Sequence, residues 1–182
     1  MRRRQHLPLL WLLSDARNDT GLNSALAKLP RGSGFVFRHY HLSRKARAAR
    51  YRDLAAVAKV REHLVVVADE VEVARALGAD GVYGPAHRIA GAKGLLKLAT
   101  THDGAELTAA ERAGADGVFL SPVFPTRSHP GTQTLGIHGF HVLAQRARIA
   151  VIALGGMTAA RAAELAWPRW GAIDGLASPQ PA

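Results

Sequence analysis

The sequence predicts an α/β fold, a (βα)8 barrel of TIM type. Short, continuously apolar segments such as Leu64–Ala68 alternate with helical segments, as in parallel strands that are buried on both faces. The segment 77–83 recurs as 113–119, and each copy reads as a helix end closed by Gly, then Asp-Gly, then a strand. Eight such strands can be counted along the chain, the number that closes this barrel. A doubly wound open sheet is the main alternative.

Each expected strand is a short run of aliphatic, β-branched or aromatic residues bounded by Gly, Pro or polar residues. The eight ranges are 9–13, 34–40, 64–68, 79–83, 95–100, 115–119, 149–154 and 173–177. The last range begins inside 170–176, which we interpret as a looser third copy of the repeated segment.

Helices are expected between these strands, and their ends carry start and stop signals. Ser43 is the expected N-cap of a long helix that reaches about Arg61, and Thr158 is the N-cap of the last helix. Three shorter helices are closed by Pro30, Gly78 and Gly114. The helical ranges are 24–29, 43–61, 70–77, 103–113, 139–147 and 159–166, with a weak helix in the Gly-rich segment 84–94.

The length predicts one domain, residues 1–182, that lacks the last helix of the barrel. The chain has 182 residues, fewer than the usual lower size of about 200 for this fold. The sequence stops shortly after the eighth expected strand, so no segment remains for an eighth helix.

Composition excludes several classes of site and favours a cytoplasmic protein. There is no cysteine, which excludes disulfides, thiol catalysis and thiolate metal sites. Residues 1–13 imitate a signal peptide, but the apolar run 7–13 is too short to span a membrane and no small-residue cleavage site follows. We therefore expect no membrane association.

The net charge of +10 predicts an anionic partner. Many of the cations lie between Arg38 and Arg61, interleaved with Ala rather than with the aromatic residues that stack on single-stranded nucleic acid. A phosphorylated small molecule is therefore favoured over nucleic acid, with a solvated Arg-rich surface as the alternative. Whether the chain forms a homo-oligomer stays an open question.

The loop after the sixth expected strand is rich in hydroxyls and cations. Ser121, Thr126 and Ser128 lie in it together with Arg127 and His129. Hydroxyl and guanidinium groups suit an anionic oxygen ligand such as phosphate, whereas a solvated surface loop would have a similar composition.

Other candidate residues follow strands whose carboxyl ends meet at one end of a barrel. Gly155-Gly156 before a helix would let backbone amides approach a phosphate, or would form an ordinary turn. Arg38 could clamp phosphate, Asp69 could hold magnesium or cap the next helix, and His102 could act as acid, base or phosphate donor.

These segments together resemble the thiamine phosphate synthase/TenI superfamily of (βα)8 barrels. The most specific matches are Ser121-Pro-Val-Phe-Pro-Thr126 and Gly155-Gly156-Met157. Weaker matches are 12–15, 37–38, 67–69, 100–102 and 114–118.

The resemblance implies a synthase that joins an aminopyrimidine pyrophosphate to a thiazole phosphate and releases pyrophosphate. By analogy, Arg38 and Thr100 would contact pyrophosphate and Asp69 would ligate magnesium. Thr126 and Ser128 would line the anion site, and Gly155-Gly156 would hold the thiazole phosphate.

The sequence departs from the family pattern at the pyrophosphate end. Val36, Tyr40, Ala68 and His129 replace polar or cationic residues of the family, and the segment 83–87 lacks the second of two expected magnesium ligands. Two alternatives follow: a TenI-type thiazole tautomerase, for which His102 would move the proton, and a non-catalytic phosphometabolite-binding relative.

Overall fold

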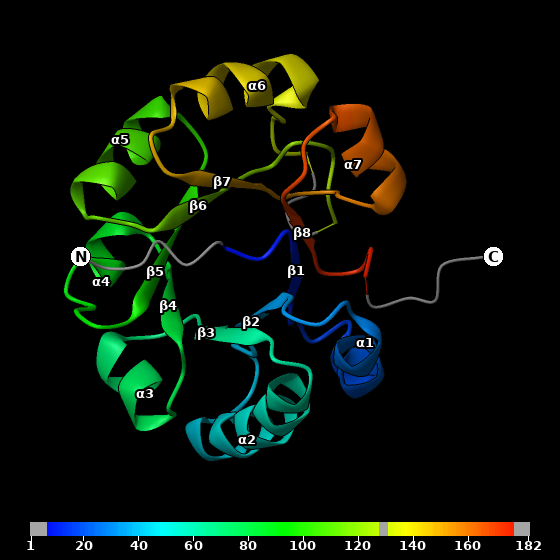
Figure 1. Cartoon of the computed structure of the whole chain (residues 1–182), viewed down its shortest axis with the longest axis vertical. Helices are drawn as coiled ribbons and strands as arrows, with labels where there is room; N and C mark the ends of the chain where they lie inside the picture. Colours follow the sequence, from blue (N-terminus) through cyan, green and yellow to red (C-terminus); the bar gives the residue numbers. More distant parts are fainter. Residues whose placement is uncertain (1–6, 128–130, 177–182) are drawn as a thin grey trace.

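Eight parallel strands close into a barrel in the computed structural model, which describes residues 7–127 and 131–176 (Figure 1). The strands pair in sequence order, and β8 pairs with β1 to complete the ring. They are β1 (Leu10–Leu13), β2 (Gly34–Phe37), β3 (Leu64–Val67), β4 (Gly81–Gly84), β5 (Leu96–Thr101), β6 (Gly117–Leu120), β7 (Ala150–Ala153) and β8 (Trp170–Ala172). The predicted barrel is confirmed, and the open sheet is excluded.

Helices surround this ring (Figure 1). They are α1 (Leu22–Lys28), α2 (Arg44–Val60), α3 (Val71–Ala76), α4 (Ala86–Ile89), α5 (Gly104–Arg112), α6 (Gly136–Arg146) and α7 (Ala159–Leu165), with a short 3-10 helix η1 (Asp19–Gly21) before α1. No helix follows β8 up to residue 176, where the described chain ends. The boundaries 1–182 of the expected single domain extend past the described residues and stay a prediction.

The predicted helix ends have the geometry that their residues suggest. The side chain of Ser43 accepts a hydrogen bond from the Ala46 amide, and that of Thr158 accepts one from the Arg161 amide. Gly78 and Gly114 have φ angles of +66° and +69°, which lie in the left-handed region where glycine ends a helix without strain.

The barrel interior is filled by alternate residues of the strands. Trp11 of β1 contacts Phe119 of β6 edge-to-face, with 5.6 Å between ring centroids, although these strands are not neighbours. Space for the indole comes from Gly34 on β2, where a Cβ would lie only 2.2 Å from the Trp11 ring. The barrel interior around Trp11 and Phe119 is therefore a packed core, and a ligand can enter the barrel only from one of its ends.

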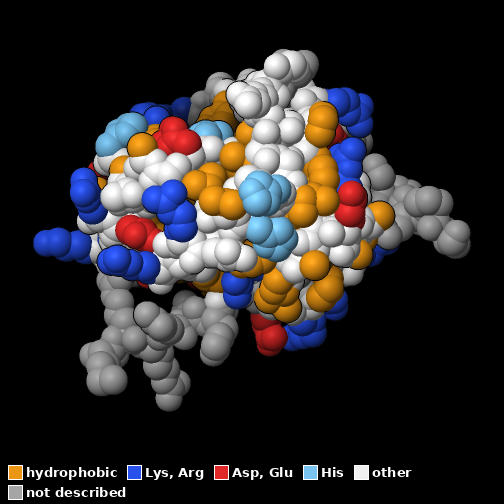
Figure 2. All heavy atoms as spheres, turned by 90° about the horizontal axis from the view of Figure 1, so that it is seen from above, with side chains coloured by type: hydrophobic (Ala, Val, Ile, Leu, Met, Phe, Trp, Pro, Cys, Tyr) orange, Lys and Arg blue, Asp and Glu red, His pale blue; other side chains and the backbone are white. Residues whose placement is uncertain are grey.

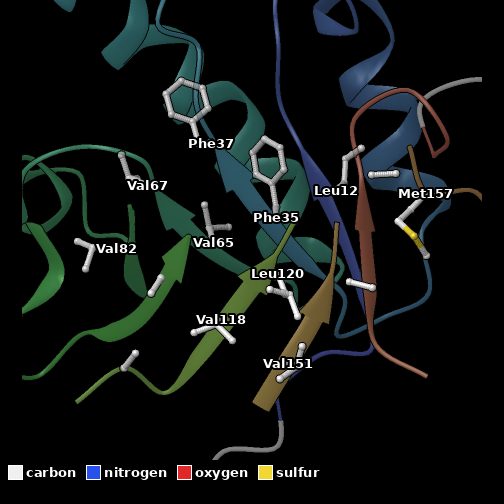
Figure 3. Packing of buried hydrophobic residues seen from close by; sticks show 14 of the residues in the cluster. Leu12, Phe35, Phe37, Val65, Val67, Val82, Val118, Leu120, Val151 and Met157 are labelled. Carbon is white, nitrogen blue, oxygen red and sulfur yellow. The ribbon is translucent and has the colours of Figure 1, made fainter. Parts of the chain in front are cut away.

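The other strand residues pack outward against the helices (Figure 3). Leu12, Phe35, Val67 and Val118 belong to this layer, and all four are fully buried. Because both strand faces are buried, the strands are continuously apolar, which is the pattern that predicted them.

The repeated Asp-Gly has a structural function. The carboxylates of Asp80 and Asp116 accept hydrogen bonds of 2.8 Å from the backbone amides of Val65 and Lys97, at the starts of β3 and β5. Each Asp therefore ties the amino ends of two adjacent strands together.

The third copy of the repeat differs, and the expected strand 173–177 is wrong. The strand is Trp170–Ala172, so Asp174 follows its carboxyl end instead of preceding its amino end. The main-chain amide of Trp170 donates to Leu9 O, and the Ile173 carbonyl accepts from Asn18. These pairings with the β1 region set the register of β8, and they are not visible in the local sequence.

Several cations of α2 and its C-terminal end bind other groups of the protein. Arg50 pairs with Asp19 at 2.7 Å, Arg47 pairs with Asp69, and Arg61 donates to the Leu29 carbonyl. On the side of the barrel shown in Figure 2, Lys and Arg side chains lie around the margin with Asp and Glu among them. None of the described helices has the length and hydropathy needed to cross a bilayer.

Candidate active site at the carboxyl ends of the strands

A cavity of about 500 Å³ opens at the carboxyl ends of the strands. Such a volume is typical of small-ligand sites. Seven of the residues predicted from the sequence line it: Arg38, Thr100, His102, Ser121, Thr126, Gly155 and Gly156. Asp69 is not among the lining residues, and Ser128 and His129 lie outside the described residues.

Arg38 enters the cavity directly after β2. Its backbone amide donates to Ser14 Oγ at 2.7 Å, and its Nη2 lies 3.6 Å from Asp15 Oδ2. Partial burial raises the pKa of Asp15, but hydrogen bonds from Arg17 and the charges of Arg17 and Arg38 outweigh this and leave the pKa lowered. The carboxylate is therefore ionised and balances the charge of Arg38.

Asp69, at the end of β3, is held by Arg47 of α2. Asp69 Oδ2 accepts from Arg47 Nη1, and Oδ1 accepts from the Glu70 amide. The same guanidinium donates to the carbonyls of Arg38 and Ala68 at 3.0 Å. Arg47 thus joins the ends of β2 and β3, with the carboxylate of Asp69 as one of its three acceptors.

This arrangement does not fit a magnesium site. Magnesium is usually bound through one or two carboxylates with several water molecules, but the Asp69 carboxylate is already neutralised by a guanidinium. At the carboxyl end of β4, the segment 83–87 offers no second carboxylate. The metal role expected for Asp69 stays a prediction, and the residues around it disfavour that role.

Asp19, His39 and His41 form another group whose nitrogen and oxygen atoms lie within 4.8 Å of one another. Both ring nitrogens of His39 already have partners, Ser14 Oγ at 2.8 Å and Asp19 Oδ1 at 2.9 Å. Arg50 also donates to Asp19 Oδ1. Since a cation already neutralises the carboxylate, we interpret this group as structural.

His102 follows β5 and is anchored to α5. Its Nδ1 lies 2.7 Å from Glu106 Oε2, and the same oxygen accepts from the His102 amide at 2.8 Å. Glu106 in turn donates its amide to Asp103, the N-cap of α5. The helix start therefore orients the imidazole, and among the described residues Nε2 is the ring nitrogen that has no hydrogen-bond partner.

The loop after β6 is fixed against β7 by its backbone. The amides of Val123 and Phe124 donate to the carbonyls of Leu154 and Gly155 at 2.9 and 3.1 Å, and the Ser121–Pro122 peptide is cis. The loop therefore packs against the glycine pair, which brings Thr126 and Gly156 to one cavity.

Gly155 and Gly156 are required by this packing. Their φ angles are +94° and +64°, and a Cβ would lie 2.6 Å from Pro122 Cα and 2.5 Å from Pro125 O, respectively. The glycine pair is therefore a structural necessity as well as a bare backbone surface facing the cavity. The helix that follows, α7, has only seven residues, so we assign no separate anion site to its N-terminus.

The inner wall of the cavity is aromatic and apolar. Tyr83 lies there, 5.2 Å from Phe119 between ring centroids, and burial raises the pKa of its hydroxyl. Leu154, Met157 and Ile173 add aliphatic surface. The cavity thus combines a charged rim with a wall that suits a flat organic ring.

Several charged residues of the site were not predicted from the sequence. Asp174 lines the cavity, lies 3.5 Å from Arg17 and 3.8 Å from Arg127, and so connects β8 to the loops after β1 and β6. Arg161 of α7 also lines the cavity. Arg161 lies inside an expected helix, 159–166, and Asp174 lies inside the misplaced strand 173–177, so no local pattern marked either residue as part of the site.

Comparison with known proteins finds one consistent family. Residues 12–177 match the family model described as thiamine monophosphate synthase. A thiamine-phosphate synthase of Synechococcus sp. is 31% identical over 173 residues, which cover 87% of this chain and 49% of the relative. One of Mycobacterium sp. is 30% identical over 177 residues, which cover 86% and 78%.

A further relative, a putative thiamine-phosphate synthase 2 of Aquifex aeolicus, is 29% identical over 113 residues, covering 59% of this chain and 61% of the relative. The chain thus spans between about half and four fifths of the length of these three relatives.

Among solved structures, thiamine phosphate pyrophosphorylase from Pyrococcus furiosus superposes with a TM-score of 0.78. The sequence identity is 23%, and the superposition covers 96% of this chain and 92% of that one. The YdjI aldolase of Escherichia coli superposes with a TM-score of 0.65 at 11% identity, covering 92% and 75%. These structural similarities support the barrel fold.

Proposed function

The chain belongs to the thiamine monophosphate synthase family, and on this premise we propose that it is a thiamine biosynthesis enzyme. The proposed reaction joins an aminopyrimidine pyrophosphate to a thiazole phosphate and releases pyrophosphate. One observation carries the proposal: seven residues predicted from separate strand ends line one cavity. Its volume and its mixture of cations, hydroxyls and apolar wall suit two phosphorylated heterocycles.

Thiazole phosphate would bind at the β6–β7 side. The phosphate would meet Gly155, Gly156 and the hydroxyl of Thr126, and the ring would lie along the apolar wall near Leu154 and Met157. This arrangement would point the ring nitrogen toward the centre of the cavity, where it attacks the pyrimidine carbon that loses pyrophosphate.

The pyrimidine pyrophosphate would bind at the β2–β5 side, against Arg38 and Thr100. As the carbon–oxygen bond breaks, negative charge grows on the leaving pyrophosphate, and a fixed guanidinium stabilises that charge. The family is generally dependent on magnesium, but the pairing of Asp69 with Arg47 disfavours a metal at this position. The protein's own contribution is therefore orientation and the charge of Arg38.

A second candidate, a thiazole tautomerase, is favoured by the contact between His102 and Glu106. A carboxylate at 2.7 Å from Nδ1 orients the imidazole toward a role in acid–base chemistry. Such a pair could move a proton on a thiazole phosphate without pyrophosphate or metal. A non-catalytic phosphometabolite-binding relative is the third reading, and the pairing of Asp69 with Arg47, which disfavours a magnesium site, also supports it.

A direct assay separates these readings. Purified protein is incubated with both substrates in magnesium and, separately, in EDTA, and thiamine phosphate is detected by its fluorescent oxidation product. We expect product that collapses in Arg38→Ala and persists in Arg146→Ala, a change at an exposed position of α6. Absence of product would contradict the synthase proposal.

The tautomerase reading has its own measurement, conversion of the thiazole phosphate isomer in the absence of pyrimidine substrate. Conversion that survives in EDTA and is lost in His102→Gln would support it. Binding of thiazole phosphate with neither reaction would identify the non-catalytic relative.

The proposal also includes a cytoplasmic location and, as an open point, assembly into a homo-oligomer. Fractionation of cells that express the full chain and the molar mass of the purified protein in solution test these two expectations. We expect no retention on DNA or RNA at moderate salt, since the charges in the cavity are placed for a small anion.

A further inference from the structure

Arg161 is a cation in the cavity whose function the proposed reaction leaves open. It is the third residue of α7 and lines the cavity beside Gly155 and Gly156. It is half-buried, so its charge faces the cavity without the full screening of bulk water.

The guanidinium of Arg161 is held in a fixed position. Its Nη1 donates to the Gly156 carbonyl at 2.5 Å, and its carbon lies 5.0 Å from the centroid of the Phe124 ring. A guanidinium carries five N–H donors. Within the described part of the chain, the Gly156 contact engages Nη1, which leaves donors on Nε and Nη2 for a ligand. Its rotamer is therefore set before a ligand arrives, which lowers the entropy cost of binding.

The charge of Arg161 differs from that of the other two arginines in the cavity. Arg38 lies 3.6 Å from Asp15, and Arg127 lies 3.8 Å from Asp174. Among the described residues, no carboxylate oxygen comes within 4.0 Å of the Arg161 guanidinium. Arg161 is therefore the cavity arginine whose charge is left for an anionic ligand to neutralise.

The groups that line the cavity with Arg161 suit a small anion. A Cβ on Gly156 would lie 2.5 Å from Pro125 O and 3.0 Å from Arg161 Nη1, so only glycine lets the loop after β6 and the guanidinium pack this closely. The hydroxyl-bearing residues Thr126 and Thr158 line the same cavity. A guanidinium that shares a cavity with hydroxyl groups matches the donors that phosphate oxygens accept.

We propose that Arg161 is the principal cation that binds the phosphate of a phosphomonoester in this cavity. The inference deepens the proposed function, since it names the residue that would anchor thiazole phosphate. It does not depend on which reaction follows, because synthase, tautomerase and binding protein would all need this anchor.

The competing explanation is that Arg161 only holds Gly156 and Phe124 in place. If this role is purely structural, substitution of Arg161 would weaken the binding of every ligand of the cavity alike, with or without a phosphate. If Arg161 anchors phosphate, the substitution would weaken the binding of phosphorylated ligands alone.

The test compares Arg161→Met, Arg161→Lys and the control Arg146→Met, which removes an exposed arginine of α6. Titration calorimetry in EDTA measures the affinity for inorganic phosphate, for thiazole phosphate and for the unphosphorylated thiazole alcohol. We expect Arg161→Met to lose about 10- to 100-fold in affinity for the phosphorylated ligands. Arg161→Lys should lose less, and the control should match the wild type.

Affinity for the thiazole alcohol should stay unchanged in all variants. Equal losses for the alcohol and the phosphate, or unchanged phosphate affinity in Arg161→Met, would overturn the proposal. The thermal midpoint of each variant without ligand shows whether it is folded. If Arg161→Met and Arg161→Lys shift this midpoint equally but Arg161→Lys keeps normal phosphate affinity, the result still supports the anchor.

Failure of the inference can be told apart from failure of the proposed function. If the wild type makes no thiamine phosphate but phosphate affinity falls in Arg161→Met, the anchor holds and the synthase reading fails. If the wild type is a synthase whose KM for thiazole phosphate is unchanged in Arg161→Met, the function holds and the anchor fails. Wild-type protein that binds neither phosphate nor thiazole phosphate would overturn both.

Discussion

The two sides of the cavity balance their charges differently. On the β1–β3 side, Arg38 faces Asp15 and Arg47 is bound to Asp69, so each of these cations has a carboxylate partner. On the β6–β8 side, Arg161 faces two glycines and hydroxyls, with no carboxylate in contact among the described residues. An anion therefore gains more charge stabilisation at the second side, whereas at the first it must compete with carboxylates that the fold already supplies.

This difference shows that charged residues near the carboxyl ends of the strands can have different functions. Asp69, at the end of β3, was expected to bind a metal ion, whereas Arg161 of α7 was not predicted from the sequence. The first is used to connect β2, β3 and α2, and the second remains available to a ligand. The following predictions test this contrast, in order of expected effect.

The largest effect is expected from Gly155→Ala, which would disrupt the β6–β8 side. Its φ is +94° and the new Cβ would lie 2.6 Å from Pro122 Cα. We expect the free energy of unfolding to fall by about 2 to 5 kcal/mol, from backbone strain and overpacking together. Urea denaturation measures it.

Gly32→Ala is the matched control for this change. Gly32 also has a positive φ, +74°, but no atom lies within 4 Å of the added Cβ. It should cost about 1 to 2 kcal/mol, from backbone strain alone. Equal losses in the two variants would show that the close packing at Gly155 has no energetic weight.

A smaller effect is expected from Asp69→Asn, which would break the pairing on the β1–β3 side. We expect the free energy of unfolding to fall by about 1 to 3 kcal/mol, since Arg47 stays largely buried without its carboxylate. Affinity for inorganic phosphate should not change, because Asp69 does not line the cavity.

The comparison variant is Arg31→Gln. Its ion pair with Glu62 is exposed on both partners, 55% and 69%, and should change stability by less than about 0.5 kcal/mol. A drop in phosphate affinity in Asp69→Asn would mean that the two sides are coupled.

Acidification should destabilise the fold modestly. Burial lowers the pKa of His39, and the charges of His41 and Arg50 lower it further, although Asp19 partly offsets this effect. Burial also lowers the pKa of His63. The unfolded chain therefore binds protons first, so stability is complete above about pH 6.5 and decreases as pH falls below it. The pKa values of Asp15 and Asp19 are lowered in the folded state. Both carboxylates therefore stabilise the fold above about pH 4, and this stabilisation is lost as pH falls further and they become protonated.

Urea denaturation at pH 7.5, 6.5 and 5.5 measures this slope. His63→Gln should flatten it, because glutamine can donate to the Leu26 carbonyl but does not titrate. An unchanged slope in this variant would assign the pH dependence to other groups.

The smallest effect is expected from magnesium. Pyrophosphate should raise the thermal midpoint equally in EDTA and in magnesium, since Arg47 already neutralises Asp69. A tenfold gain in affinity from the metal would instead add about 3 to 5 °C. If that gain appears in the wild type and disappears in Asp69→Asn, the metal role expected from the family is correct.

Sequence reasoning located most of the fold and most of the cavity. Apolar periodicity placed seven of the eight strands to within two residues at the start and three at the end, because a strand buried on both faces must be apolar throughout. The ends of those strands then located Arg38, Thr100, His102 and Ser121 at one cavity.

The misplaced strand and the missed residues share one cause. The register of β8 depends on pairing with β1 and β7, and the function of Asp174 depends on Arg17 and Arg127. Partners of this kind are distant in sequence, so no local pattern indicates them.

The sequence by itself determined the barrel, its helix ends and the family of the chain, because hydrophobic periodicity and capping are local properties. Only the tertiary structure decided which charges are available. Asp69 and Arg161 each carry a full charge, but Arg47 lies against the first and no described carboxylate lies against the second. The electrostatic energy of a side chain depends on its neighbours in space, and the fold chooses those neighbours.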